Sequence, residues 1–325
     1  MGSLSKLIIR NLKRDIMEKI CVILVNYNGK EYNDKCIDSI FNSTIVERIQ
    51  IVVIDNDSSD GSRERLHKKW DCDERIHIID LAENSGFAKA NNIGIRWAMK
   101  NGITNYLMLN NDTEIEPDAI EKMWRCHEEN ACIVTPKIFY ADKSNILWCA
   151  GGRFSPIIMK PVQIGENKEN SERYNKDYNC DFANGCAIFF DEKILKRTGF
   201  LDESFFLYYE DTEFSMRAKQ KGIPIRYCAE AVVYHKVNGS TKGNQNYRNV
   251  YYITRNWLIY AKKRLGKKIW IFWIYFLANR LIWGGIWIVT GKPRMCQAIY
   301  MGIRDYLIWK YKPELYSDKL EEGKC

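Results

Sequence analysis

The chain has 325 residues, 46% of them hydrophobic, which is enough for one large domain with a sizeable core and an appended region. Its eleven cysteines form no C-x-x-C pair, and an odd number spread along the chain is typical of reduced cytosolic thiols rather than of a disulfide framework. The first nineteen residues are basic and only briefly apolar, so we expect no cleaved secretory signal.

The net charge of +8 is concentrated in one region. Residues 261–312 contain eleven basic residues and one acidic residue, which gives a net charge of +10 there and −2 over the rest of the chain. This region is also rich in aromatic residues. An anionic membrane surface fits that combination better than nucleic acid does, because no nucleic-acid-binding motif accompanies the charge.

The first part of the chain alternates short apolar runs with amphipathic stretches, the pattern of repeated βαβ units around a mainly parallel sheet. The predicted strands are 20–25, 49–54, 76–81 and 106–109, and the predicted helices are 34–41, 87–100 and one that begins at Pro117. Clusters of Asn and Asp follow these strands. Open parallel sheets build ligand sites at the carboxyl ends of their strands, so we expect these loops to converge on one crevice.

Residues 138–181 show no clear period, and we expect a variable loop or lid that helps to shape an acceptor site. Regular patterns return with a strand at 186–190, a helix at 191–197 and a strand at 231–234. The predicted domains are a basic segment (1–19), a catalytic domain (20–240) with a nucleotide-binding half (20–115) and an acceptor half (116–240), and a C-terminal helical region (241–325).

Asn110, Asn111 and Asp112 form the first of two clusters that could carry chemistry. They follow an apolar strand, where a carboxylate suits a hard cation such as Mg²⁺ or Mn²⁺ and the two amides suit sugar hydroxyls. A divalent cation is the usual means of neutralising a leaving nucleoside diphosphate. The same residues are equally compatible with a polar turn that caps the next helix.

Glu210 and Asp211 form the second cluster and follow the aromatic run 205–209. Aromatic neighbours should remove water from at least one carboxylate and raise its pKa towards that of a general base. An acidic first helical turn is the alternative interpretation, and both can hold together. His235 ends the last predicted strand and is a candidate to complete a metal site, although a lone histidine is more often structural.

Six segments carry a family resemblance: VILVNYNG at 22–29, VIDNDSSDGS at 53–62, NSGFAKANNIG at 84–94, LNND at 109–112, ANGCA at 183–187 and LDESFFLYYEDTEFSMR at 201–217. In this order they resemble family 2 glycosyltransferases of the α/β GT-A fold, particularly the rhamnosyltransferase-like branch. Each segment alone is weak evidence, whereas the ordered set over two thirds of the chain is strong. The resemblance implies an inverting transfer from a nucleoside-diphosphate sugar during synthesis of surface polysaccharides.

The resemblance also implies roles for single residues. Asp211 matches the general base, with Glu210 as the second candidate, and Asp112 matches the metal-binding aspartate of a D-x-D-like motif. Asn110 stands where many relatives carry the first Asp of that motif. The predicted metal ligands are therefore Asp112 and His235. The candidate donor-binding residues are Asn26, Asn28, Asp55, Asp57, Asn84, Gly86, Asn91, Asn110 and Asn111. Within this set, Asp55 is expected to contact the base or ribose, whereas a residue in the place of Asp57 is more often turn-forming than ligand-binding.

The implied partners are a dTDP- or UDP-sugar and a glycan or polyprenyl-diphosphate-linked acceptor, with rhamnose as the leading sugar by analogy. A processive polysaccharide synthase is one alternative, but Arg248 is followed by Asn249, which breaks its Q-x-x-R-W motif. A sugar nucleotidyltransferase would show a G-x-G-x-R loop after the first strand. A catalytically silent nucleotide-sugar-binding protein is the third alternative, and the joint presence of Asp112, Glu210 and Asp211 argues against it.

Residues 269–290 are mostly apolar and, at about 1.5 Å per residue, long enough to cross a bilayer core of roughly 30 Å. Arg280 lies at their midpoint, where it costs about 2.5–3.5 kcal/mol on insertion scales. Basic residues flank both ends, against the positive-inside tendency. We therefore favour helices in the cytosolic leaflet or a re-entrant hairpin, anchored by Trp270, Trp273, Trp283 and Trp287, and expect a cytoplasmic, peripheral or monotopic protein. A single span and an aromatic subdomain packed on the body are the alternatives.

Overall fold

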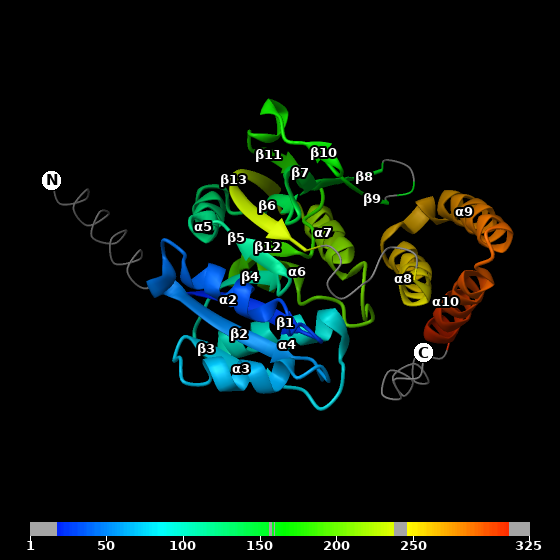
Figure 1. Ribbon diagram of the computed structural model, residues 1–325. Helices are drawn as coiled ribbons and strands as arrows, with labels where there is room; N and C mark the ends of the chain where they lie inside the picture. The colour runs from blue at the N-terminus through cyan, green and yellow to red at the C-terminus, as the bar shows by residue number, and fades with distance from the viewer. Residues whose placement is uncertain (1–17, 156–157, 159, 237–245, 312–325) are drawn as a thin grey trace.

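A computed structural model of the chain (Figure 1) describes residues 18–155, 158, 160–236 and 246–311, so the predicted basic segment lies almost wholly outside it. Its strands and helices are β1 (Ile20–Asn26), α2 (Asn33–Phe41), β2 (Ile49–Asp55), α3 (Ser62–Trp70), β3 (Ile76–Asp80), α4 (Gly86–Lys100), β4 (Asn105–Asn110), β5 (Thr113–Ile115), α5 (Ala119–Asn130), β6 (Ile133–Tyr140), β7 (Lys143–Cys149), β8 (Gly152–Phe154), β9 (Pro161–Gln163), β10 (Lys168–Glu169), β11 (Tyr178–Cys180), β12 (Ala187–Asp191), α6 (Glu192–Thr198), α7 (Glu210–Gln220), β13 (Ile225–His235), α8 (Tyr247–Arg264), α9 (Ile269–Val289) and α10 (Pro293–Tyr311).

A mixed sheet in the order β10-β7-β6-β12-β4-β1-β2-β3 forms the centre of the protein. Its β4, β1, β2 and β3 strands are parallel, as predicted, whereas β12 is antiparallel to β4. The register places Asn26 at the end of β1 beside Asp55 at the end of β2, and Val25 beside Asn110 at the end of β4. The polar residues after these strands therefore meet at one edge of the sheet.

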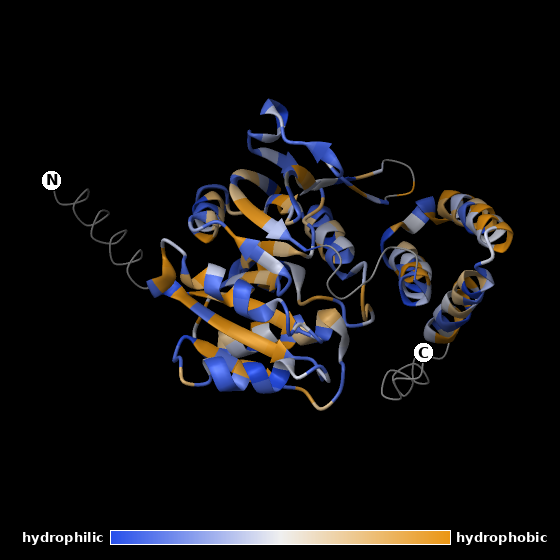
Figure 2. Ribbon diagram, in the orientation of Figure 1, coloured by the Kyte–Doolittle hydropathy of each residue, from blue (hydrophilic) through white to orange (hydrophobic). Residues whose placement is uncertain are grey.

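Helices cover both faces of the sheet, which gives three layers (Figures 1 and 2). Ile20, Val22 and Leu24 of β1 share one core cluster with α2, α3 and α5. Cys21 and Ile23 point the other way and share a second cluster with α4, α6 and α7. Because both faces of β1 and β2 are covered, these strands are continuous apolar runs rather than alternating ones.

Two predictions about this part of the chain are wrong. Residues 138–181 are not a lid or an irregular loop, because β7 and β10 extend the central sheet and β8 pairs with β9. The pairing of β6 with β7 shifts register twice, and these interruptions hide the twofold period that would have identified the strands. In addition, α5 begins at Ala119 and not at Pro117, which lies in the preceding turn.

The C-terminal helices α8, α9 and α10 lie beside the sheet domain and share a core with it (Figure 1). Phe205 and Tyr209 from the aromatic run belong to the same cluster as Trp257 of α8 and Phe272 of α9. Much of α9 stays exposed, including the apolar side chains Trp270, Ile274, Leu277, Leu281, Ile282, Ile288 and Val289. Among the described residues, one helical stretch, Gly266–Val289, is long and apolar enough to cross a membrane, which by itself is weak evidence for a span.

The two faces of α9 predict opposite effects of substitution. Phe272 is fully buried against Trp257, so Phe272→Ala should lower the free energy of unfolding by about 3–5 kcal/mol. Ile274 is 65% exposed, and Ile274→Ala should change stability by less than about 0.5 kcal/mol. Urea unfolding of both variants in a mild detergent measures the difference. Equal effects would contradict the docked arrangement of α9.

Candidate functional site

The side chain of Asn26 joins the loops that follow β1, β2 and β4. It is fully buried, and its amide nitrogen lies 2.7 Å from Asp55 Oδ2 and 2.9 Å from Ser62 Oγ. Its carbonyl oxygen accepts hydrogen bonds from Asn33 Nδ2 at 2.9 Å and from Asn111 Nδ2 at 3.1 Å. In this structure Asn26 therefore organises the crevice from within, and its predicted contact with the donor stays a prediction.

Asp55 lies in the same network, with a fully buried carboxylate. Besides Asn26, it accepts hydrogen bonds from the backbone N–H of Ser58 at 3.0 Å and from Arg63 Nε at 2.8 Å. Asp57 is half exposed, has a positive φ of 65° and lies 3.7 Å from the Arg63 guanidinium. The structure thus buries Asp55 beneath the loops after β1 and β2 and leaves Asp57 half exposed at the surface.

The loops after β1 and β2 also lock together through Asn28 and Gly29. Asn28 adopts a positive φ of 57°, and its side-chain oxygen accepts a hydrogen bond from the backbone N–H of Ser59 at 2.8 Å. A Cβ at Gly29 would lie 2.2 Å from Asn111 Nδ2 and 2.6 Å from Asn26 Oδ1. Only glycine therefore fits this position without moving the network.

Asn84 and Gly86 form the third side of the crevice and depend on Asn56, which the sequence reasoning missed. Asn56 Nδ2 donates to Asn84 Oδ1 at 3.0 Å, and Asn84 Oδ1 also accepts from the backbone N–H of Gly86 at 3.0 Å. Gly86 has a φ of +80°, and a Cβ there would lie 2.6 Å from the carbonyl oxygen of Phe206. The start of α4 is thereby in direct contact with the aromatic run.

Asn91 lies deeper in α4 and does not reach the surface of the crevice. Its side chain is 1% exposed, and its amide nitrogen donates to the carbonyl oxygen of Phe87 at 2.9 Å, one helical turn earlier. The contact is internal to the helix. The predicted role of Asn91 in donor binding has no supporting contact here and stays a prediction.

Asp112 and His235 meet at the end of β4 and β13. Asp112 Oδ1 lies 3.2 Å from His235 Nε2, and both side chains are nearly buried, at 12% and 11% exposure. Trp148 packs against the imidazole, with 5.6 Å between ring centroids. The neighbouring Asn111 amide is fixed by Asn26 and Asn33, whereas Asn110 Oδ1 has no hydrogen-bond partner. The structure therefore brings together both residues that were predicted to bind a metal.

This group of atoms fits a divalent cation. Asp112 Oδ1 is buried and makes no hydrogen bond, which is costly for a carboxylate oxygen that has no other ligand, and His235 Nε2 is the ring nitrogen that faces it. Adjacent ligands of an octahedral ion at about 2.1 Å lie roughly 3 Å apart, close to the separation of Asp112 Oδ1 and His235 Nε2. A carboxylate beside an imidazole is a pair of donors that suits Mn²⁺.

Glu210 and Asp211 begin α7, directly after the aromatic run. Burial raises the pKa of Glu210 well above its ordinary value, and the charge of the adjacent Asp211 raises it further. Burial also raises the pKa of Asp211, against hydrogen bonds from the backbone N–H groups of Gly185 and Thr212 that lower it. Asp211 is only partly buried and Glu210 is buried, with Glu210 Oε2 unpartnered. Both carboxyl groups therefore bind a proton more readily than ordinary carboxylates do, and Asp211 is the more accessible of the two.

The turn that delivers this pair is strained and is held in place by α8. Tyr208 and Tyr209 have positive φ values of 70° and 75°, a backbone conformation that costs of order 1–3 kcal/mol for each such residue. The amide nitrogen of Asn256 donates to the carbonyl oxygens of Leu207 at 2.7 Å and of Tyr208 at 2.8 Å. Asn256 is fully buried. A residue in the C-terminal region therefore positions the carboxylates of the catalytic domain.

Gly185 and Cys186 connect the two clusters across the sheet edge. The backbone N–H of Gly185 donates to Asp211 Oδ2 at 2.9 Å. The carbonyl oxygen of Cys186, the next residue, accepts from the backbone N–H of Asn110 at 2.9 Å. Asp211 is consequently two hydrogen bonds and one peptide unit away from β4, whose last residue, Asn110, lies two residues before Asp112. Two sequence motifs that are about a hundred residues apart, Asn110 to Asp112 and Glu210 to Asp211, are thereby connected at one edge of the sheet.

The family model described as Glycosyl transferase family 2 matches residues 21–199, more than half of the chain. The chain belongs to glycosyl transferase family 2. It is 28% identical over 267 residues to the low-salt glycan biosynthesis hexosyltransferase Agl10 of Haloferax volcanii, covering 79% of this chain and 80% of that protein. It is 25% identical over 224 residues to the dTDP-rhamnosyl transferase RfbF of Shigella flexneri, covering 67% and 69%. The protein is a nucleotide-sugar-dependent glycosyltransferase of glycan or polysaccharide biosynthesis.

Solved structures show the same fold. The structure of GalNAc-T7 with UDP, GalNAc and Mn²⁺ has a TM-score of 0.55 at 16% identity, covering 67% of this chain and 43% of that one. The structure of S. aureus TarS 1-349 in complex with UDP has a TM-score of 0.50 at 16% identity, covering 75% and 65%. The chain thus spans less than half of GalNAc-T7. At these identities the likeness shows the fold alone, a GT-A-like α/β fold with a mixed, mostly parallel sheet, as predicted.

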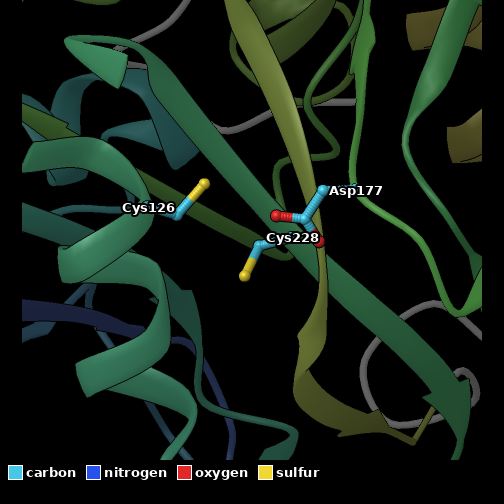
Figure 3. Close-up of side chains that lie close together, drawn as sticks. All are labelled: Cys126, Asp177 and Cys228. Carbon is cyan, nitrogen blue, oxygen red and sulfur yellow. The ribbon is translucent and has the colours of Figure 1, made fainter. Parts of the chain in front are cut away.

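A second cluster of ligand-type side chains lies away from the crevice of this family 2 glycosyltransferase, between α5 and β13 (Figure 3). The ligand atoms of Cys126, Asp177 and Cys228 lie within 4.8 Å of one another. A hydrogen bond with Cys132 is the main cause that raises the pKa of Cys126 to about 12. The Asp177 carboxylate already accepts the backbone N–H of Ala229 at 2.8 Å. These contacts hold Cys126 and Cys228 in the core and Asp177 at its exposed edge.

Arg248 and Asn256 are the functional candidates that the sequence reasoning missed in this glycosyltransferase. Arg248, at the start of α8, has its guanidinium 5.8 Å from the Tyr27 ring and 5.9 Å from the Phe206 ring. Among the described residues it pairs with no carboxylate, so its charge is available beside the crevice. The signal in the sequence was weak: Arg255 and Asn256 form a polar pair within a long apolar and aromatic stretch.

Removing the Asn256 amide should lower kcat of the glycosyltransferase without changing its affinity for nucleoside diphosphate. Asn256→Ala leaves the carbonyl oxygens of Leu207 and Tyr208 without their donor, so the strained turn should relax and Glu210 and Asp211 should move. A small displacement of a catalytic group costs about 10- to 100-fold in rate. We expect kcat to fall by that factor while the Kd for nucleoside diphosphate stays nearly constant.

The matched control is Asn246→Ala on the same helix. Asn246 caps α8 by accepting the backbone N–H of Asn249 at 2.8 Å, and it makes no contact with the turn. Its loss should cost about 1 kcal/mol of stability and leave kcat unchanged. Equal loss of kcat in both variants would mean that α8 acts only through overall stability, and the positioning role of Asn256 would be wrong.

Proposed function

We propose that the enzyme is an inverting glycosyltransferase that moves a hexose or deoxyhexose from a nucleoside-diphosphate donor to a hydroxyl group of a glycan. The observation that carries the proposal is the link through Gly185 and Cys186, which holds Asp211 and the strand of Asp112 at one sheet edge. A general base and an anion-neutralising group on opposite sides of one sugar are what a single displacement requires.

In the proposed reaction Asp211 accepts the proton of the acceptor hydroxyl. The hydroxyl oxygen forms a bond to the anomeric carbon as the bond from that carbon to the diphosphate oxygen breaks, and the leaving nucleoside diphosphate keeps the electron pair. The raised pKa of Asp211 makes it a stronger base than an ordinary carboxylate. Glu210, whose pKa is raised further, stays protonated while Asp211 is ionised, so that only one negative charge is buried there.

The proposed donor site is the crevice between the loops after β1, β2 and β4. Asp55 and Asn84 would hold the nucleoside, Asn110 and Asn111 the sugar, and Arg248 the diphosphate. Asp112 and His235 would hold a divalent cation, which when bound would offset the negative charge of the leaving diphosphate. GT-A enzymes commonly use such a metal, and the buried, unpartnered Asp112 Oδ1, 3.2 Å from His235 Nε2, supports it here.

The donor class follows from the relatives. One is a hexosyltransferase of glycan biosynthesis and another is a dTDP-rhamnosyl transferase, which supports a dTDP- or UDP-linked hexose or rhamnose as donor. The exposed apolar face of α9 and the basic charge of residues 261–312 support a site of action at the cytoplasmic face of a membrane. A lipid-linked glycan at that surface is the proposed acceptor.

Two isosteric substitutions test the assignment of the base. Asp211→Asn should abolish transfer and leave nucleotide binding nearly intact, because an amide cannot accept the proton. Glu210→Gln imitates a protonated Glu210 and should keep most of the activity. Because burial raises the pKa of Asp211, the activity of both wild type and Glu210→Gln should fall as the pH drops through that raised pKa, above the ordinary value of 3.8.

Release of UDP or dTDP from a panel of nucleotide sugars, measured from acid to neutral pH, gives the necessary rates and identifies the donor. Full activity in Asp211→Asn would remove Asp211 from the role of base. Loss of activity in Glu210→Gln, with Asp211→Asn still active, would assign that role to Glu210 instead. No turnover of any donor by the wild type would favour the silent binding protein.

Binding of Mn²⁺ tests the metal site independently of turnover. Asp112→Asn and His235→Gln should each weaken Mn²⁺ binding by about tenfold or more, as measured by electron paramagnetic resonance of free Mn²⁺. Glu114→Gln is the matched control, since Glu114 lies two residues from Asp112 but points to Lys236 at 3.3 Å. If the control loses as much affinity as Asp112→Asn, the ion is held by general surface charge and the proposed site is wrong.

A further inference from the structure

The cluster of Cys126, Asp177 and Cys228 brings three metal-ligand side chains together from separate parts of the chain. Cys126 belongs to the second half of α5, Asp177 to the segment just before β11, and Cys228 to the first half of β13. One ligand atom from each residue lies within 4.8 Å of the other two. Figure 3 shows one carboxylate oxygen of Asp177 pointing towards the space between the two sulfur atoms. The three donors therefore surround a common point.

These donors match the ligand preference of Zn²⁺. Thiolates favour zinc over the hard cations Mg²⁺ and Ca²⁺, and a carboxylate oxygen is also a zinc ligand. In a tetrahedral site with bonds of about 2.3 Å to sulfur and about 2.0 Å to oxygen, ligand atoms lie roughly 3.5–3.8 Å apart. Since the three atoms are already within 4.8 Å, side-chain shifts of about 1 Å would bring them to zinc-binding distance. Water would take the fourth position.

An irregularity in β13 holds the carboxylate of Asp177 beside Cys228. The pairing of β13 with β6 is in register up to Cys228 and resumes at Val232, so the residues between them have no register partner on β6. The backbone N–H of Ala229, directly after Cys228, donates instead to Asp177 Oδ1 at 2.8 Å. Hydrogen bonds of this kind orient the ligands of metal sites in proteins. The shift in register thus fixes the carboxylate next to a thiol.

The charges around the cluster complement those of zinc. Two thiolates and one carboxylate carry three negative charges, one more than Zn²⁺ neutralises. Arg226 supplies a further positive charge, because its Nε lies 3.7 Å from Asp177 Oδ2. Cys126 and Cys228 are 6% and 4% exposed, whereas Asp177 is exposed at the surface. An ion can therefore enter from the side of Asp177 and be held away from water by the two sulfur atoms.

We propose that Cys126, Cys228 and Asp177 bind one Zn²⁺ ion, which joins α5 and the segment before β11 to β13. Zinc binds cysteine as thiolate, so the two thiol protons pass to solvent when the ion binds. Because the ion connects residues that are distant in sequence, its binding stabilises the folded chain. The site is separate from the candidate donor site, since His235 ends β13 roughly 20 Å further along the strand, at about 3.3 Å per residue.

The absorption of Co²⁺ tests the site in the full-length protein, reduced and stripped of metal. Co²⁺ occupies tetrahedral zinc sites, and its ligation by thiolate gives a charge-transfer band that oxygen and nitrogen ligands do not give. The wild type should develop this band up to one equivalent of Co²⁺, and Zn²⁺ should remove it. Asp112→Asn should develop the same band, because Asp112 and His235 provide no thiolate.

Substitution of each ligand should weaken zinc binding. Cys126→Ser, Cys228→Ser and Asp177→Asn should each lower the affinity for Zn²⁺ by about tenfold or more, since even the loss of an outer-shell partner costs about 10- to 100-fold. Competition with a chromophoric zinc chelator measures the affinity. Asp177 is exposed, and asparagine keeps an oxygen that accepts the N–H of Ala229, so this variant tests the site without disturbing the core.

The matched control is Cys180→Ser, on β11 close to Asp177 in sequence. Cys180 is a buried thiol that donates to the carbonyl oxygen of Phe182 at 3.6 Å, and it lies outside the cluster. Its replacement should leave both the Co²⁺ band and the affinity for Zn²⁺ at the wild-type values. An equal loss of affinity in Cys180→Ser and in Asp177→Asn would assign zinc binding to scattered thiols and overturn the proposal.

Two further results would overturn the proposal. One is the absence of a thiolate band at one equivalent of Co²⁺ in the reduced wild type. The other is a disulfide between Cys126 and Cys228, found by mass spectrometry in protein purified with Zn²⁺ present, because the sulfur atoms would then ligate no metal. All of these measurements read metal binding and none reads sugar transfer, so their outcome is independent of the proposed glycosyltransferase reaction.

Discussion

The buried side chain of Asn26 is the constraint on which the site depends. A fully buried amide must find partners for its donors and its acceptor, and here those partners come from the loops after three neighbouring strands. Satisfying one group therefore fixes the relative positions of Asp55, Gly29 and Asn111. Close to this network, the sheet edge also carries Asp112 Oδ1, which is buried without a hydrogen-bond partner, as is Glu210 Oε2, and ligands and protons are expected to bind there.

The C-terminal helices contact the candidate site and also carry the exposed apolar side chains of α9. Asn256 holds the strained turn at Tyr208 and Tyr209, and Arg264 forms an ion pair with the fully buried Glu213 one turn into α7. The aromatic run, residues 205–209, therefore contacts the start of α4, α8 and α9. Because these contacts share one core, binding at the membrane surface and alignment of the catalytic pair can affect each other physically.

Much of the fold could be predicted from the sequence because the strands β1, β2 and β4 are short, continuous apolar runs that end in polar clusters. The prediction failed at β7 to β11, where bulges and two- or three-residue strands leave no period to detect. At the site, local patterns and chemical type were enough to predict Asp112, His235, Glu210 and Asp211. They did not predict Asn56 and Asn256, because these two residues matter through contacts with residues distant in sequence, which no local pattern reveals.

Tyr208 and Tyr209, whose backbone has positive φ values, limit how such an enzyme can change its acceptor. A new C-terminal region, gained by recombination between relatives, would meet a turn at Tyr208 and Tyr209 that keeps its shape only with a donor in the position of Asn256. The turn before Glu210 and Asp211 and the helix that supports it therefore need to be inherited together. Chimeras designed for new acceptors should cross over before residue 201, so that the aromatic turn and its supporting helix come from the same parent.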